Sequence, residues 1–219
     1  MALIIGRPFT GVFWGLEAVH SAIIALICFI IYFKTREIQQ LSLHEGVRYF
    51  RKTFLLFGIA SLLKLLTRHL AVSFFLYPGI LGISGEVIAL GVLSILYAHT
   101  MAAFYLLYSL SWKNLDWCKP WLMHIGALLI ALTVLITNAQ LLYLAFQVLL
   151  IAYSIRIIHG KKPTQILVIS ELLLIFWTIS LVDTLMPITP VWQILNYIVS
   201  FSIFLMILHK VQNRLKVIK

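Results

Sequence analysis

The chain is poor in charged residues, and this scarcity excludes most soluble folds. Only 11% of its 219 residues are charged, whereas 62% are hydrophobic and the mean hydropathy is +1.03. A soluble domain of this length could not bury so much apolar surface. The sequence therefore predicts a protein whose solvent is largely lipid, with no segment left over for a soluble domain.

The motifs of common catalytic and nucleotide-binding sites are also missing. The sequence contains no phosphate-binding loop, HExxH zinc motif, CxxC pair or nucleophile elbow. Its two cysteines, Cys28 and Cys118, do not make a disulfide framework. These absences favour a function other than enzyme catalysis, although Glu17 and His20 would still offer an acid and a base within the membrane.

Long apolar runs predict seven membrane-spanning helices in one all-α transmembrane domain that covers residues 1–219. A helix needs about 20 apolar residues to cross the hydrocarbon core. The two shortest runs meet at Thr137 and Asn138, where we expect a tight helical hairpin. The expected spans are residues 11–33, 53–76, 83–109, 120–137, 139–158, 164–185 and 190–211.

Basic residues gather on one side of this seven-span arrangement. Of the 17 lysines and arginines, Arg7 alone falls on the opposite side and Lys64 and Arg68 lie within the second span, which leaves fourteen. Because cytoplasmic loops carry an excess of basic residues, we expect the N-terminus outside and the C-terminus in the cytoplasm of a multi-pass plasma-membrane protein. The segment 34–52 is expected to be either a solvated loop or a short interfacial helix.

The net charge of +10 does not indicate a nucleic-acid partner. The basic residues lie in short loops beside apolar spans and do not form a basic domain, so they serve as topology signals that contact lipid headgroups. The partners that we expect are the lipid bilayer and a small solute, an ion or a redox partner. An oligomer or a larger membrane complex is compatible with this sequence.

Ionisable side chains inside the spans are the most informative residues, because each costs from about 2.5 to above 10 kcal/mol in hydrocarbon. Glu17 and His20 share one face of the first span, and Lys64 and Arg68 share one face of the second. Antiparallel packing would pair Glu17 with Lys64 or Arg68. We expect a substrate or ion site there, with Glu171 of the sixth span as a further carboxylate. A purely structural ion pair is the equally weighted alternative.

Four histidines within the spans suggest a second kind of site. His20 and His69 lie in the outer half of the membrane, and His99 and His124 lie in the inner half. Each pair would hold the iron of one haem b between neighbouring helices, and two stacked haems would carry electrons across the membrane. The simpler interpretation of each histidine is a hydrogen bond to a helix carbonyl or a hydroxyl. No metal other than haem iron is expected, since a di-iron site needs two Glu-x-x-His motifs.

Three functions follow from these residues. The buried charges favour a transporter or channel for a proton, an ion or a small anionic solute. The alternatives are a b-type cytochrome and a heptahelical sensor or accessory membrane subunit. The topology is similar to that of rhodopsins and heptahelical receptors, but Lys210 lies at the cytoplasmic end of the seventh span and not near its centre, where a retinal Schiff base would need it.

Overall fold

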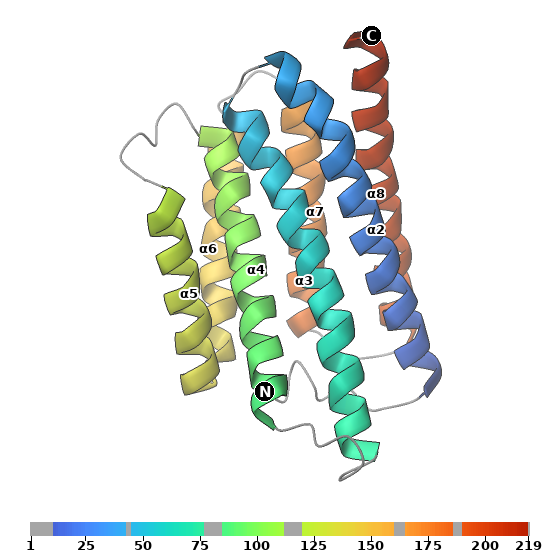
Figure 1. Cartoon of the computed structure of the whole chain (residues 1–219), viewed down its shortest axis with the longest axis vertical. Helices are drawn as coiled ribbons and strands as arrows, with labels where there is room; N and C mark the ends of the chain where they lie inside the picture. The colour runs from blue at the N-terminus through green and yellow to red at the C-terminus, as the bar shows by residue number, and fades with distance from the viewer. Residues whose placement is uncertain are drawn as a thin grey trace.

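The computed structural model describes residues 11–42, 45–76, 85–111, 120–159, 165–185 and 190–218, and all regular structure in these residues is α-helical. The helices run side by side in one bundle (Figure 1). They are α2 (Gly11–Ser42), α3 (Glu45–Leu76), α4 (Gly85–Ser111), α5 (Pro120–Thr137), α6 (Gln140–His159), α7 (Gln165–Leu185) and α8 (Pro190–Ile218). Within the described residues, the expected all-α bundle of seven helices is thus confirmed.

Six of the seven helices are long and apolar enough to cross a membrane. In α7 the described apolar stretch, Leu167–Ser180, is shorter than in the other six. Large apolar side chains also point outward, with Ile136, Leu141 and Val191 each more than three-quarters exposed. Such an exterior would be costly in water and suits a lipid solvent.

The segment 34–52 differs from both structures expected for it. Helix α2 continues to Ser42 and α3 begins at Glu45, so neither a long loop nor a separate interfacial helix is present. The extension of α3 contacts α2, because Arg51 Nε donates a hydrogen bond to the Tyr32 carbonyl at 3.2 Å and its guanidinium lies 4.6 Å from the centre of the Tyr32 ring. Phe50 is buried on the same turn of α3.

The hairpin between α5 and α6 forms where the sequence places it. Asn138 has a φ of 53°, in the left-handed region that asparagine tolerates at a helix end. The hydroxyl of Thr137 accepts a hydrogen bond from the backbone N–H of Ala139 at 3.3 Å, and the Ala139 carbonyl accepts one from Leu142 at 3.1 Å. These bonds end α5 and start α6 within two residues.

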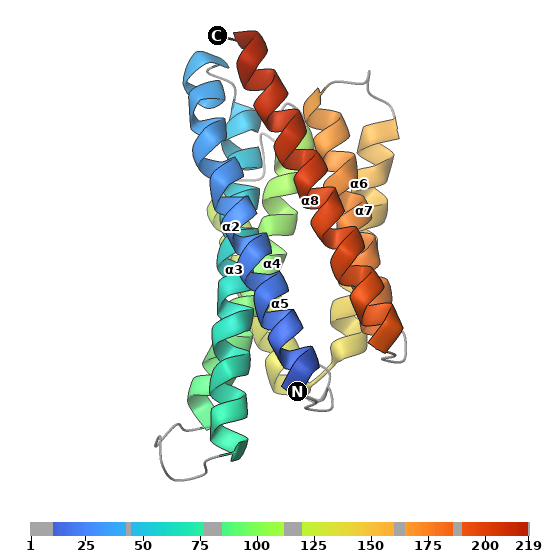
Figure 2. The same cartoon turned by 90° about the vertical axis from the view of Figure 1, so that its right-hand side faces the viewer.

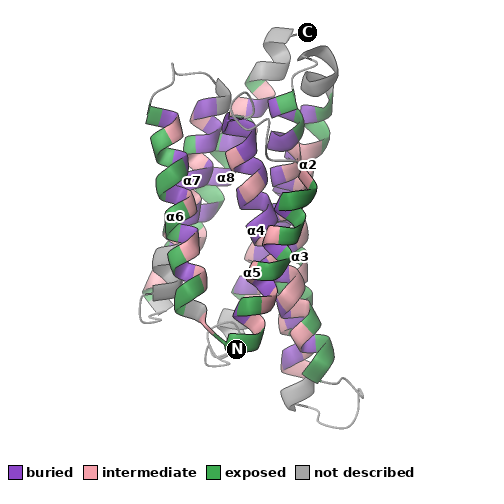
Figure 3. Ribbon diagram, turned by 90° about the vertical axis from the view of Figure 1, so that its left-hand side faces the viewer, coloured by how far each residue is buried: buried purple, intermediate pink, exposed green. Residues whose placement is uncertain are grey.

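The packing order of the helices determines which side chains meet. Helix α3 lies between α2 and α4, whereas α8 packs against α2 and α7 (Figures 1 and 2). Helix α5 lies at the edge, against α4 and α6. Buried positions follow the inward faces of the helices (Figure 3). The apolar core includes Ile31, Phe54, Leu106, Leu173 and Phe204.

Candidate functional site

Glu17 on α2 is the centre of a charged cluster between α2 and α3. It is almost fully buried. Its Oε2 forms an ion pair with Arg68 Nη1, and its Oε1 lies 3.1 Å from Lys64 Nζ. Lys64 and Arg68 are one helical turn apart on α3, so both reach the same carboxylate. The structure thus brings together three of the residues that the sequence singled out.

The three groups of this Glu17 cluster differ in exposure. The side chain of Arg68 is 16% exposed and that of Lys64 is 47% exposed, so Lys64 is the more accessible cation. Two positive charges meet one negative charge, which leaves the cluster with a net charge of +1. The space between the groups is about 10 Å³, room for about one water molecule. It is lined by Glu17, Ala18, Ser21, Lys64, Leu65 and Arg68.

A polar stripe on α8 faces the interior beside α2. Gln193, Asn196 and Ser200 are buried, and the Ser200 hydroxyl donates a hydrogen bond to Asn196 Oδ1 at 3.2 Å. Next to this stripe, the ring of Tyr197 stacks on His20 of α2, with 4.5 Å between the ring centroids. The stripe was not predicted from the sequence, although the spacing 193, 196, 200 repeats every three to four residues and would have indicated one helix face.

Three further residues, Glu171, His69 and His20, were predicted to take part in the substrate site or the outer haem site. Glu171 is exposed on α7, where the structure does not join it to the Glu17 cluster. His69 occupies an exposed position on α3, about 100° around the helix from Arg68. His20 packs against Tyr197. Haem binding by His20 and His69 stays a prediction.

The structure does not bring His99 and His124 together as a pair of axial ligands. Both ring nitrogens of His124 are hydrogen-bonded: Nδ1 lies 2.6 Å from the Tyr97 hydroxyl, and Nε2 lies 2.9 Å from the Tyr105 hydroxyl. His99 is about 200° around α4 from Tyr97 and packs edge-on against Phe57 of α3, with 5.8 Å between centroids. These residues do not fit a haem between α4 and α5, because a bond from iron to His124 would first require one of its hydrogen bonds to break.

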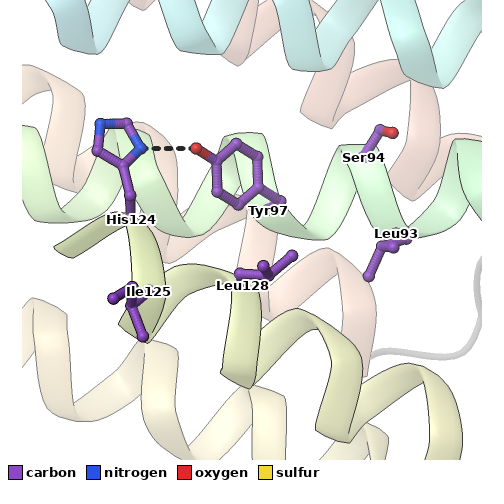
Figure 4. A pocket seen from close by; sticks show the side chains of 6 residues that line it. All are labelled: Leu93, Ser94, Tyr97, His124, Ile125 and Leu128. Carbon is purple, nitrogen blue, oxygen red and sulfur yellow. Dashed lines mark hydrogen bonds between the residues drawn. The ribbon is translucent and has the colours of Figure 1, made fainter. Parts of the chain in front are cut away.

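A pocket of about 320 Å³ lies beside His124, between α4 and α5 (Figure 4). The hydrogen bond between Tyr97 and His124 was not predicted from the sequence, although a tyrosine in the middle of an apolar span indicates a polar contact within the membrane. Within the described residues, no group of three or more His, Cys, Asp or Glu side chains is arranged to hold a metal ion. The pocket is lined by Leu93, Ser94, Tyr97, His124, Ile125 and Leu128.

Comparison with known proteins gives one informative relative. Over 215 residues the chain is 31% identical to a protein of Archaeoglobus fulgidus described as uncharacterized. The alignment covers 93% of this chain and 94% of that protein, so it includes most of the bundle. No protein-family model and no solved structure matches the chain.

Proposed function

This chain belongs to the same family as the Archaeoglobus fulgidus protein, and we propose that it binds a small anion at the Glu17 cluster and moves it across the membrane. The observation that supports this function best is the buried carboxylate between two cations. Lys64 and Arg68 bring two positive charges to the single negative charge of Glu17. An anion that enters the site would gain charge-assisted contacts with these cations.

The difference in exposure between the two cations supports a division of roles. Arg68, with its side chain 16% exposed, would hold Glu17 in place. Lys64, with its side chain 47% exposed, has a long flexible stem and would turn from Glu17 toward the anion. Transport requires binding that is strong enough for entry and weak enough for release. Lys64 would release Glu17 when it binds the anion and return to Glu17 when the anion leaves. Binding and release of the anion would then both be possible.

The same geometry favours an anion over a proton as the transported species. A proton bound to Glu17 would remove the only negative charge of the cluster while Lys64 and Arg68 stay in contact with it. The two cations oppose that step, since nearby positive charges stabilise the ionised carboxylate. An anion placed beside Lys64 is repelled by Glu17 but attracted by both Lys64 and Arg68, so attraction by the two cations outweighs the repulsion.

The size of the site limits the anion and requires movement. A space of about 10 Å³ admits only a water-sized species. We therefore expect Lys64 to move away from Glu17 when an anion of a few atoms binds. The predicted orientation places this cluster in the outer half of the membrane, so entry would be from the outside.

A binding measurement tests the proposed site. Nitrate, formate and inorganic phosphate are titrated into the detergent-purified protein, and heat release is followed by calorimetry. We expect saturable binding of at least one of these anions, weakened about tenfold or more in Lys64→Gln because a charge-assisted contact is lost. Lys34→Gln is the matched control, since Lys34 is an exposed lysine of α2 outside the cluster. No binding of any of the three anions would contradict the proposal.

The sensor hypothesis shares this site but predicts no transport. An anion that binds the folded protein raises its melting temperature, whether or not it is carried across the membrane. Anion-dependent stabilisation without flux would therefore favour a sensor or accessory subunit. The cytochrome hypothesis predicts neither result, and His99 and His124 would have to rearrange before they could bind one haem.

A further inference from the structure

Tyr97, His124 and Tyr105 form a continuous chain of hydrogen bonds across the α4/α5 interface. The imidazole of α5 lies between two hydroxyls of α4, at 2.6 Å from Tyr97 and 2.9 Å from Tyr105. Tyr97 and His124 also line the pocket between these helices (Figure 4). Tyr105 is buried at the other end of the chain, with Lys52 Nζ 5.3 Å from its ring centre.

Only one of the two tyrosine hydroxyls can donate a hydrogen bond to His124 when its imidazole is neutral. A neutral histidine has one N–H donor and one acceptor nitrogen, so it cannot accept hydrogen bonds from both tyrosines. When Nδ1 carries the proton, it donates to the Tyr97 oxygen, and the Tyr97 hydroxyl is free to donate to another acceptor. In the other tautomer the available hydroxyl is that of Tyr105. The first tautomer thus presents a hydrogen-bond donor at the pocket.

The pocket has the size and the opening of a site for a lipid-soluble molecule. Its volume of about 320 Å³ falls within the range of about 300 to 1,000 Å³ that is typical of small-molecule sites. Ile125 and Leu128 line it and are also exposed on the outer surface of the bundle. A ligand dissolved in the bilayer would therefore enter sideways from the lipid.

The lining and the depth of the pocket restrict the ligand further. None of the six lining residues carries a formal charge when His124 is neutral, which favours an uncharged ligand over a fatty acid or a phosphate. Tyr97 is close to the middle of α4 (Gly85–Ser111), which the predicted topology places near the membrane midplane. The ester carbonyls of phospholipids lie at the edge of the hydrocarbon core, about 15 Å from the midplane, and would not reach Tyr97.

We propose that the α4/α5 pocket binds a lipid-soluble carbonyl compound of the quinone class, with one carbonyl oxygen accepting a hydrogen bond from the Tyr97 hydroxyl. The ring would lie against Leu93 and Leu128, and the alkyl tail would leave between Ile125 and the lipid. His124 acts as a positioning residue, because its tautomer decides whether Tyr97 donates to the ligand. This site is separate from the Glu17 cluster, with which it shares no residue.

The test compares a quinone with a hydrocarbon of similar shape. Decyl-1,4-benzoquinone and decylbenzene are titrated separately into the purified protein in lipid nanodiscs, with empty nanodiscs as the blank. We expect saturable binding of the quinone to the wild-type protein. Tyr97→Phe should weaken quinone binding about three- to tenfold, the effect of one lost hydrogen bond, and leave decylbenzene unchanged. Tyr153→Phe is the matched control, since Tyr153 is exposed on α6 and does not line the pocket.

A second variant keeps the test decisive if Tyr97→Phe does not fold. Leu128→Trp adds bulk to the pocket from an exposed position on α5 and should abolish binding of both compounds. Leu141→Trp, at an exposed site on α6, should bind both as the wild-type protein does. Three results would overturn the proposal: no quinone binding above the blank, equal quinone affinity in Tyr97→Phe, or unchanged quinone binding in Leu128→Trp.

Discussion

Gly91 on α4 lies directly against the side chain of Thr67 on α3. A Cβ added at Gly91 would collide with Thr67 Oγ1 and approach its Cγ2 to 2.8 Å. Small residues allow helix backbones to approach closely in membranes, where van der Waals packing holds helices together. Thr67 is the neighbour of Arg68 and lies one turn from Lys64. This close contact therefore fixes the part of α3 that carries both cations of the Glu17 cluster.

Gly91→Ala should accordingly destabilise the protein. The added methyl group has to displace the buried Thr67, and overpacking of this kind typically costs about 1 to 3 kcal/mol. The matched control is Gly15→Ala, because a Cβ at Gly15 meets no atom within 4 Å. We expect a lower melting temperature in detergent for Gly91→Ala than for Gly15→Ala, with partial recovery when Thr67→Ala is added. Equal melting temperatures for the two glycine variants would show that the helices do not approach as closely as described.

The ion pair between Glu17 and Arg68 predicts non-additive effects on stability. Glu17→Gln takes the shared carboxylate away from both Arg68 and Lys64, whereas Arg68→Gln leaves Glu17 in contact with Lys64. Breaking a buried ion pair from one side costs about 3 to 5 kcal/mol. Glu17→Gln should therefore lower the melting temperature more than Arg68→Gln, and the double variant should lose less than the sum of the two single variants. Glu171→Gln, an exposed carboxylate of α7, should change it little. Strict additivity would mean that the two charges do not interact.

The arrangement of His99 and His124 predicts that these two histidines do not share a haem. His99 packs against Phe57 and both nitrogens of His124 are hydrogen-bonded, so neither is positioned to share one iron. Protein purified after expression with added haem should show no Soret band that depends on either residue. A band that shifts on reduction with dithionite and weakens in His99→Ala or His124→Ala would contradict this expectation.

The distribution of basic residues predicts the orientation of the bundle. A tag placed after Lys219 should be protected in intact cells, and a tag placed before Met1 should be accessible to a protease or an antibody added outside. The second tag serves as the internal control for the first. Accessibility of both tags, or of neither, would mean that the number of spans is not seven.

Much of the fold could be predicted from the sequence because the bilayer imposes a length on each apolar run. The bounds of α5, Pro120–Thr137, agree with the expected span, since a proline starts the helix and the hairpin at Asn138 ends it. The extensions of α2 and α3 could not be predicted in this way. They include several charged and polar residues, so no continuous apolar run marks them, and the contact of Arg51 with Tyr32 is seen only in the folded chain.

The charged cluster was predicted from the sequence, whereas the chain of hydrogen bonds at His124 was not. Glu17, Lys64 and Arg68 lie on consecutive helices, and the cost of a charge in hydrocarbon requires them to find partners. The prediction that His99 lies near His124 used their similar depth in the membrane and not the directions of their side chains. Their relative direction depends on the rotation of α4 about its own axis, which is set by packing against α3 and α5 and is not encoded in the spacing of the residues.

The most direct test of the proposed function is anion flux into liposomes that contain the purified protein. Uptake of nitrate, formate or inorganic phosphate is measured down a concentration gradient, with protein-free liposomes as the blank. We predict uptake of at least one of these anions by the wild-type protein and by Lys34→Gln, and a loss of about tenfold or more in Lys64→Gln, as expected when the accessible cation of the cluster is removed. Uptake by the wild-type protein equal to that of protein-free liposomes, or full uptake by Lys64→Gln, would contradict transport through the Glu17 cluster.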